Sequence, residues 1–202
     1  MNNNPEISAE AITNRFGMWI FLFTEMLLFG ALFIVYTVYR FRNPVAFHLG
    51  AQNLNVVFGT ANTVILLTSS AAIAMSITAV QRNNRKLALA FIATTLFLGL
   101  LFLLNKYFEW SEHIRDHIYP GSSVLGLRGQ GDVLFFGLYF FMTGLHALHV
   151  IVGLTLITIV ITKVAIKRIN SGHYVLLENS ALYWHLVDIV WIFLYPMLYL
   201  IT

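Results

Sequence analysis

The chain has 202 residues, of which 58% are hydrophobic and 10% are charged. An average soluble domain carries about 25% charged residues, so this composition excludes an ordinary water-soluble protein. The net charge of +3 comes from basic residues that are scattered along the chain and form no nucleic-acid-binding motif, so we expect no nucleic-acid partner. The absence of cysteine excludes disulfides, c-type haem attachment and thiolate-bound metal centres.

Five apolar segments are long enough to cross a hydrocarbon core, which requires about 20 residues in a helix. They are predicted at residues 16–39, 56–80, 87–104, 133–161 and 181–201. The sequence therefore predicts an all-α integral membrane bundle of five transmembrane helices, forming a single domain over residues 1–202. The first fifteen residues lack the basic region and cleavage site of a signal peptide, so we expect the first span to remain in the mature protein.

The distribution of Lys and Arg predicts how the bundle is oriented. With five spans, the two termini lie on opposite sides of the membrane. Seven Lys and Arg residues fall on the N-terminal side of the predicted spans and five on the other side. Because cytoplasmic loops are enriched in these residues, the N-terminus is predicted to be cytoplasmic. The basic loop residues are expected to contact anionic lipid headgroups.

Five ionisable side chains fall inside the predicted spans, where a charged group costs about 2.5–3.5 kcal/mol. They are Glu25, His146, His149, His185 and Asp188. Each is therefore a candidate functional residue. Glu25 lies near the middle of the first span, so its carboxyl must be protonated, hydrogen-bonded or in contact with water. This favours either a structural bond to a neighbouring helix or a role in proton or lipid chemistry.

The other four candidates come in pairs on the last two spans. His146 and His149 are three residues apart and share a helix face, as do His185 and Asp188. We expect Asp188 to accept a hydrogen bond from His185 or from a histidine of the fourth span, so that the four form an interhelical polar network. The His-x-x-His spacing does not match the zinc-protease helix, and no metal site is predicted.

Two further groups of residues are predicted to lie at the membrane surface. One is a charged cluster after the third span, interpreted as a solvated helix extension: Glu109, Glu112, His113, Asp116 and His117. The other is a set of aromatic residues near span ends, interpreted as interfacial anchors: Trp19, Tyr107, Trp110, Trp184 and Tyr199.

Several sequence motifs resemble those of a known family. The long ones are TGLHALHVIVG at residues 143–153 and YWHLVDIVW at residues 183–191, and shorter ones include residues 19–25, 61–63 and 109–110. In these segments, and in the same order over nearly the whole chain, the sequence resembles subunit III of the haem–copper terminal oxidases. Longer members have seven spans, and this sequence looks like the short five-span bacterial form of quinol or cytochrome c oxidases.

The resemblance implies a subunit without redox centres, in a proton-pumping complex that reduces oxygen to water in the bacterial cytoplasmic membrane. Haem and copper would lie in partner subunits, with subunit I as the main contact and subunit II nearby, and phospholipid would bind between the helices. Glu25 falls on the family's intramembrane glutamate, at the lipid cleft and near the proton-uptake side. Lys163 occupies a position where the family often has a basic residue facing a lipid phosphate. The electron donor is set by another subunit.

Three alternatives fit the same spans. A subunit III-like protein associated with nitric oxide reductase shares the five-span layout. A b-type membrane cytochrome would hold haem between the fourth and fifth spans through His146 or His149 and His185. A small proton-coupled transporter would be built around Glu25, although the sequence has no internal repeat to favour it.

Overall fold

The computed structural model describes residues 5–200. Residues 1–4 and 201–202 lie outside the described part, as do the side chains of residues 5–11 and 128. The described chain is helical, because within a bilayer the backbone must satisfy its own hydrogen bonds. Its elements are α1 (Pro5–Arg42), α2 (Pro44–Gln52), α3 (Val56–Gln81), α4 (Arg85–Arg115), α5 (Ser123–Arg128), α6 (Gln130–Ala165), α7 (Val175–Tyr195) and the π-helix η1 (Pro196–Leu200).

The prediction of five membrane-spanning helices is confirmed. Five described helices are long and apolar enough to cross a membrane: Ile12–Arg42, Val56–Gln81, Arg85–Arg115, Gln130–Ala165 and Val175–Leu200. Four of them agree with the predicted spans to within a few residues at most ends, and the predicted end at residue 201 lies outside the described residues. The third span differs, because its helix continues well past residue 104 to Arg115.

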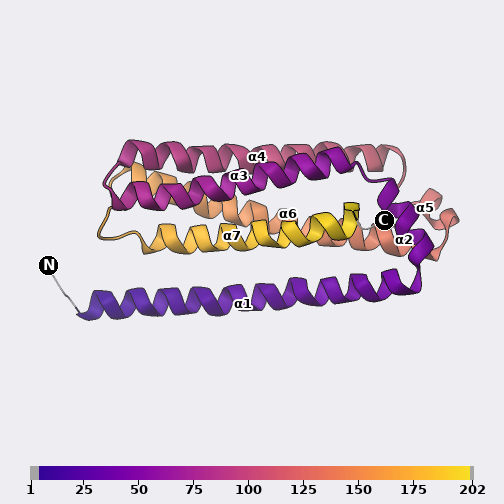
Figure 1. Cartoon of the computed structure of the whole chain (residues 1–202), viewed down its shortest axis with the longest axis horizontal. Coiled ribbons are helices and arrows are strands. Elements are labelled where there is room, and N and C mark those ends of the chain that lie inside the picture. The colour runs from indigo at the N-terminus through magenta and orange to yellow at the C-terminus, as the bar shows by residue number, and fades with distance from the viewer. Residues whose placement is uncertain (1–4, 201–202) are drawn as a thin grey trace.

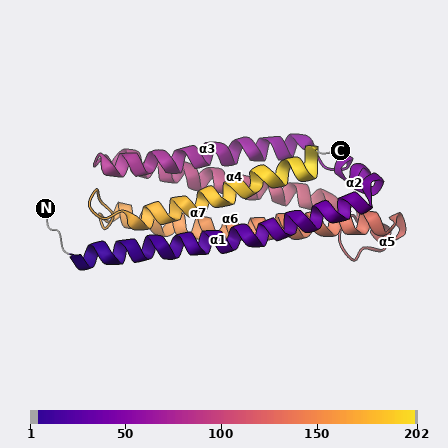
Figure 2. The ribbon, with the colours of Figure 1, turned by 60° about the horizontal axis from the view of Figure 1, so that its bottom comes forward.

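The five spans run up and down as an elongated bundle with the two termini at opposite ends (Figure 1). The helices α3 and α4 form the most extensively packed pair, and α7 contacts α1, α3 and α6. The short helices α2 and α5 lie at the same end as the C-terminus (Figures 1 and 2). Following the orientation predicted from the sequence, we call this the outer end and the opposite end the inner end.

Asparagines define the helix ends at the short α3–α4 connection. The Asn84 side chain accepts a hydrogen bond from the Leu87 amide at 3.2 Å and so caps the start of α4. The preceding residue, Asn83, has a φ of 55°, a left-handed conformation that asparagine tolerates better than most residues. The turn is therefore tight, and α3 and α4 are antiparallel neighbours.

The core of the bundle is organised around Trp184, whose indole is 1% exposed. A Cβ placed on Gly99 of α4 or on Gly153 of α6 would come within 2.7 Å or 2.8 Å of its ring. Both glycines are thus needed for the close approach of three helices, as small residues are in other membrane bundles. The Trp184 Nε1–H also donates to Ser69 Oγ of α3 at 3.0 Å.

The interfacial-anchor prediction is therefore wrong for Trp184, and also for Tyr199, which is 1% exposed. Both lie near span ends in sequence but face other helices. Trp19 and Tyr107 are 61% and 67% exposed, as an anchor requires.

Helix α1 is the most exposed span. Of its most apolar 18-residue window, 11% is buried, compared with 56% for α7. Near the inner end, Arg15 forms an ion pair with Glu178 of α7 at 2.6 Å. Near the outer end, the buried Tyr36 hydroxyl donates to the Met197 carbonyl in η1 at 2.6 Å. These contacts hold α1 along one side of the bundle, where Figure 2 shows it beside α6 and α7.

Candidate functional site

Glu25 on α1 pairs with His149 on α6 in the middle of the bundle. The Glu25 Oε2 and His149 Nε2 atoms are 2.9 Å apart, and the two side chains are 16% and 11% exposed. The Phe29 ring packs edge-on against the imidazole at a centroid distance of 5.1 Å. Tyr183 of α7 donates to the His149 carbonyl at 3.2 Å, so three helices fix the position of this histidine.

The hydrogen bonds of His149 determine what this pair can do chemically. Its Nδ1–H donates to the Leu145 carbonyl at 2.7 Å, because a carbonyl oxygen can only accept. In the neutral imidazole the Nε2 atom then carries no proton, and the bond to Glu25 must use a carboxyl proton. In the charged form, Nε2 carries that proton and Glu25 is a carboxylate. A hydrogen bond between Nε2 and the carboxyl therefore requires one proton, which either partner can carry.

His185 and Asp188 of α7 meet a serine of α3. The His185 Nδ1 and Ser70 Oγ atoms are 2.5 Å apart. The Asp188 Oδ1 atom is buried and has no hydrogen-bond partner among the described residues. The partner of His185 is thus Ser70 of α3, and Asp188 Oδ1 does not accept the hydrogen bond from a histidine that the sequence led us to expect.

His146 is fully buried, and within the described chain neither ring nitrogen has a hydrogen-bond partner. Its ring lies edge-on to Phe102 at 5.5 Å and beside Trp191 at 5.2 Å. The four polar residues of the last two spans are consequently divided. His149 faces α1, His185 and Asp188 face α3, and His146 lies in an aromatic part of the core.

A buried charge cluster at the outer end was not predicted. Lys106 Nζ donates to Glu109 Oε2 at 2.9 Å, to Tyr199 Oη at 2.7 Å and to Tyr139 Oη at 3.2 Å. Both tyrosine hydroxyls donate to the other carboxylate oxygen of Glu109. The ammonium also lies 5.3 Å from the Trp191 ring. With side-chain exposures of 3% for Lys106 and 1% for Glu109, the ion pair is sealed from solvent and fully hydrogen-bonded.

The prediction that the charged segment after the third span is a solvated extension is wrong for Glu109 and His113, which are 0% and 7% exposed. Glu112, Asp116 and His117 are exposed as predicted. The sequence does contain a signal for the buried part. Lys106 and Glu109 lie on one face of a helix that remains rich in large apolar residues, and tyrosines occur at 139 and 199 in other spans.

Lys163 lies in the last turn of α6 at the inner end and is half-buried. It is thus remote along α6 from the outer-end cluster. No group of three or more His, Asp or Glu residues in the described part of the chain is placed to hold a metal ion. Both ring nitrogens of His149 are engaged by protein atoms, which does not favour this histidine as a haem ligand.

Comparison with known proteins decides the family. The sequence profile of cytochrome c oxidase subunit III matches residues 8–202. The chain belongs to this family. Subunit 3 of the cytochrome bo(3) ubiquinol oxidase of Buchnera aphidicola is 30% identical to it over 92% of this chain and 92% of the relative. Cytochrome c oxidase subunit 3 of Homo sapiens is 32% identical over 92% of this chain and 68% of the human protein.

A third relative, the haem–copper oxidase subunit I+III of Aeropyrum pernix, is 34% identical over 93% of this chain, which spans 22% of that longer protein. As a member of the subunit III family, the chain is the non-catalytic subunit III of a haem–copper terminal oxidase. The family match does not favour the nitric oxide reductase, b-type cytochrome and transporter alternatives.

Proposed function

We propose that this subunit III supports proton uptake and sustained turnover in a proton-pumping oxidase of the bacterial cytoplasmic membrane. Oxygen reduction, haem and copper belong in this proposal to partner subunits, with subunit I as the main contact and subunit II in the same complex. The name of the Aeropyrum relative, subunit I+III, supports the contact with subunit I, since it places both in one chain. The observation that carries the proposal is the contact of 2.9 Å between Glu25 Oε2 and His149 Nε2, at which we propose that one transferable proton is held.

The location of the pair fits a proton-holding role. Glu25 is about 20 Å along the first span from Ile12, at 1.5 Å per residue, and so lies close to the bilayer midplane. A carboxyl at this depth with no partner would be costly, and the histidine stabilises it in either protonation state. The partial exposure of both side chains leaves the pair open to lipid, water or a partner subunit on the α1 side.

We also propose that the subunit binds phospholipid and that its N-terminus lies in the cytoplasm. The exposed apolar surface of α1 provides a lipid-facing wall, and Lys163 is proposed to face a lipid phosphate at the inner end. A lysine carries the same charge as an arginine at this position, but it cannot bind a phosphate through two parallel hydrogen bonds as an arginine can. The excess of Lys and Arg on the N-terminal side supports a cytoplasmic N-terminus, which makes the inner end cytoplasmic.

Replacing Glu25 by Gln tests the proton-holding role. The amide can still donate to His149 Nε2, so we expect the complex to assemble normally, but it cannot release a proton at neutral pH. Turnover should therefore decay sooner than in the unsubstituted complex. Glu112→Gln, which alters an exposed carboxyl, is the control. Unchanged turnover lifetime and lipid content in Glu25→Gln would remove Glu25 from the functional residues.

Affinity purification of the tagged chain in mild detergent tests the assignment to a complex. We expect haem–copper oxidase subunits I and II to co-purify, and the chain separated from them to be colourless. The co-purifying subunits also identify the electron donor as quinol or cytochrome c. Recovery of the chain alone with a haem absorption band would contradict the proposal and would make the intramembrane histidines ligands.

A further inference from the structure

A second polar site lies at the inner end of the bundle, away from Glu25 and one turn beyond Lys163. A cavity of about 280 Å³ opens between the α3–α4 turn and the α6–α7 connection. Three buried apolar residues line it: Val80, Val164 and Ile169. Its rim includes Arg85, Lys167 and Asn170. At about 30 Å³ per water molecule, the volume equals that of roughly nine waters, enough for a headgroup but not for a whole lipid.

The cationic side of the rim is held in place by the helix ends. The Arg85 Nε–H donates to the Val164 carbonyl at 3.0 Å, and a terminal guanidinium nitrogen donates to the Ala165 carbonyl. Arg85 is thereby anchored on the last carbonyls of α6. Lys167 follows with a φ of 61°, directly after that helix ends. Two positive charges therefore border one cavity, and Arg85 is fixed before any ligand arrives.

The surroundings of the cavity are strongly basic. Residues 81–86 and 163–173 contain no Asp or Glu, and their Lys and Arg residues are Arg82, Arg85, Lys86, Lys163, Lys167 and Arg168. The helix dipoles do not offset these six charges. Two helices end here, each contributing about −0.5 charge, and two begin here, each contributing about +0.5. The local field therefore attracts anions.

We propose that this cavity binds the phosphate diester headgroup of an anionic phospholipid. The turns that form it lie between spans, at the level where headgroups are found. An apolar floor continuous with the spans suits the glycerol and upper acyl region, and the cationic rim suits the phosphate. A lysine binds phosphate as a point charge without requiring a fixed geometry, which fits the exposed Lys167. The site adds a second phospholipid position to the one proposed at Lys163, which does not line this cavity, and it does not depend on the proton chemistry proposed for Glu25.

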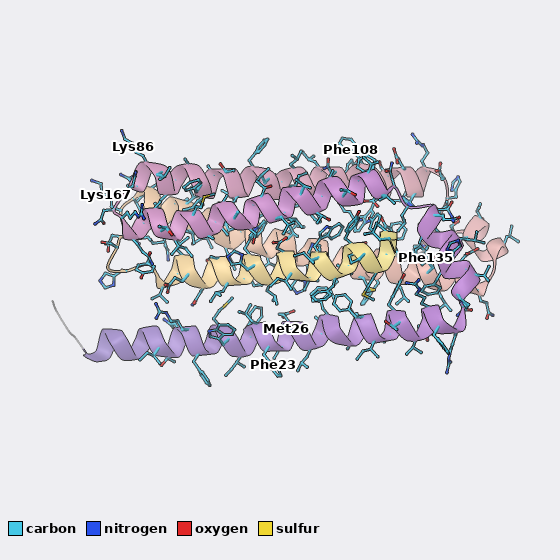
Figure 3. The ribbon with its side chains drawn as sticks, viewed as in Figure 1. Phe23, Met26, Lys86, Phe108, Phe135 and Lys167 are labelled. Carbon is cyan, nitrogen blue, oxygen red and sulfur yellow. The ribbon has the colours of Figure 1, made fainter. Side chains whose placement is uncertain are left out.

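The test compares two lysines at the inner end, Lys167 in the cavity and Lys86 outside it, both labelled in Figure 3. The complete oxidase is purified with Lys167→Gln, Lys86→Gln or Lys167→Arg. Each complex is placed in nanodiscs of phosphatidylcholine mixed with phosphatidylglycerol. The complex is then released from the nanodisc, and native mass spectrometry counts the phosphatidylglycerol molecules that remain bound to it. Glutamine, like lysine, is unbranched at Cβ, so the left-handed backbone at position 167 is strained equally.

We expect Lys167→Gln to lose one retained phosphatidylglycerol, and Lys86→Gln and Lys167→Arg to retain it. Equal loss in Lys167→Gln and Lys86→Gln would overturn the proposal in favour of diffuse attraction. Full retention in Lys167→Gln would overturn it as well. Loss of a partner subunit from Lys167→Gln with unchanged lipid content would assign the cavity to a protein contact instead.

Discussion

Replacing Lys106 by Met is expected to destabilise the subunit by about 3–5 kcal/mol, because it leaves the Glu109 carboxylate buried without its counter-charge. The carboxylate would keep two tyrosine donors but no cation, in a site where its side chain is 1% exposed. The measurement is the unfolding free energy of the isolated subunit in mixed detergent micelles, followed by helix content. Lys86→Met, which removes an exposed lysine from the same helix, should change stability little.

A double variant separates the cost of an unpaired charge from the value of the pair. In Lys106→Met with Glu109→Gln, both charges are gone and the amide oxygen can still accept from Tyr139 or Tyr199. We expect most of the lost stability to return, since removing both members of a buried ion pair is often near neutral. A double variant as unstable as Lys106→Met alone would mean that the pair itself provides the stability.

Replacing Trp184 by Ala is expected to cost about 3–5 kcal/mol, the range for large aromatic residues in well-packed cores. The indole fills the space over Gly99 and Gly153, so its removal leaves a cavity where three helices meet. It also leaves the Ser69 hydroxyl without its donor. The same unfolding assay measures the effect.

Trp19→Ala is the matched control, because Trp19 is 61% exposed. We expect it to leave the unfolding free energy nearly unchanged. If both tryptophan variants lost the same stability, interfacial anchoring rather than packing would be the role of Trp184.

The number and order of the spans could be predicted because lipid imposes a length and a polarity on each crossing segment. The partners of the intramembrane polar groups could not. Helical spacing places His149 on a face of its own helix, but the choice of Glu25, 124 residues away, depends on which helices are neighbours. The same is true of Ser70, which bonds His185 from a different span.

The buried ion pair escaped prediction for another reason. A hydropathy window treats each charged residue as a cost, whereas Lys106 and Glu109 largely satisfy each other one helical turn apart. The remaining hydrogen bonds come from Tyr139 and Tyr199 in other helices, which no local window includes. The third span therefore continues past the point where its sequence becomes charged.

The contacts of α1 have a consequence for the biogenesis of the subunit. Its polar attachments include Arg15 to Glu178, Glu25 to His149 and Tyr36 to the Met197 carbonyl, and each of these partners lies at least 124 residues later in the chain. Because the N-terminal part of a chain is synthesised first, α1 enters the membrane long before its partners exist. It must remain there surrounded by lipid until α6, α7 and η1 have been inserted. The first helix to be inserted therefore cannot form these attachments until the last helices of the chain are in the membrane.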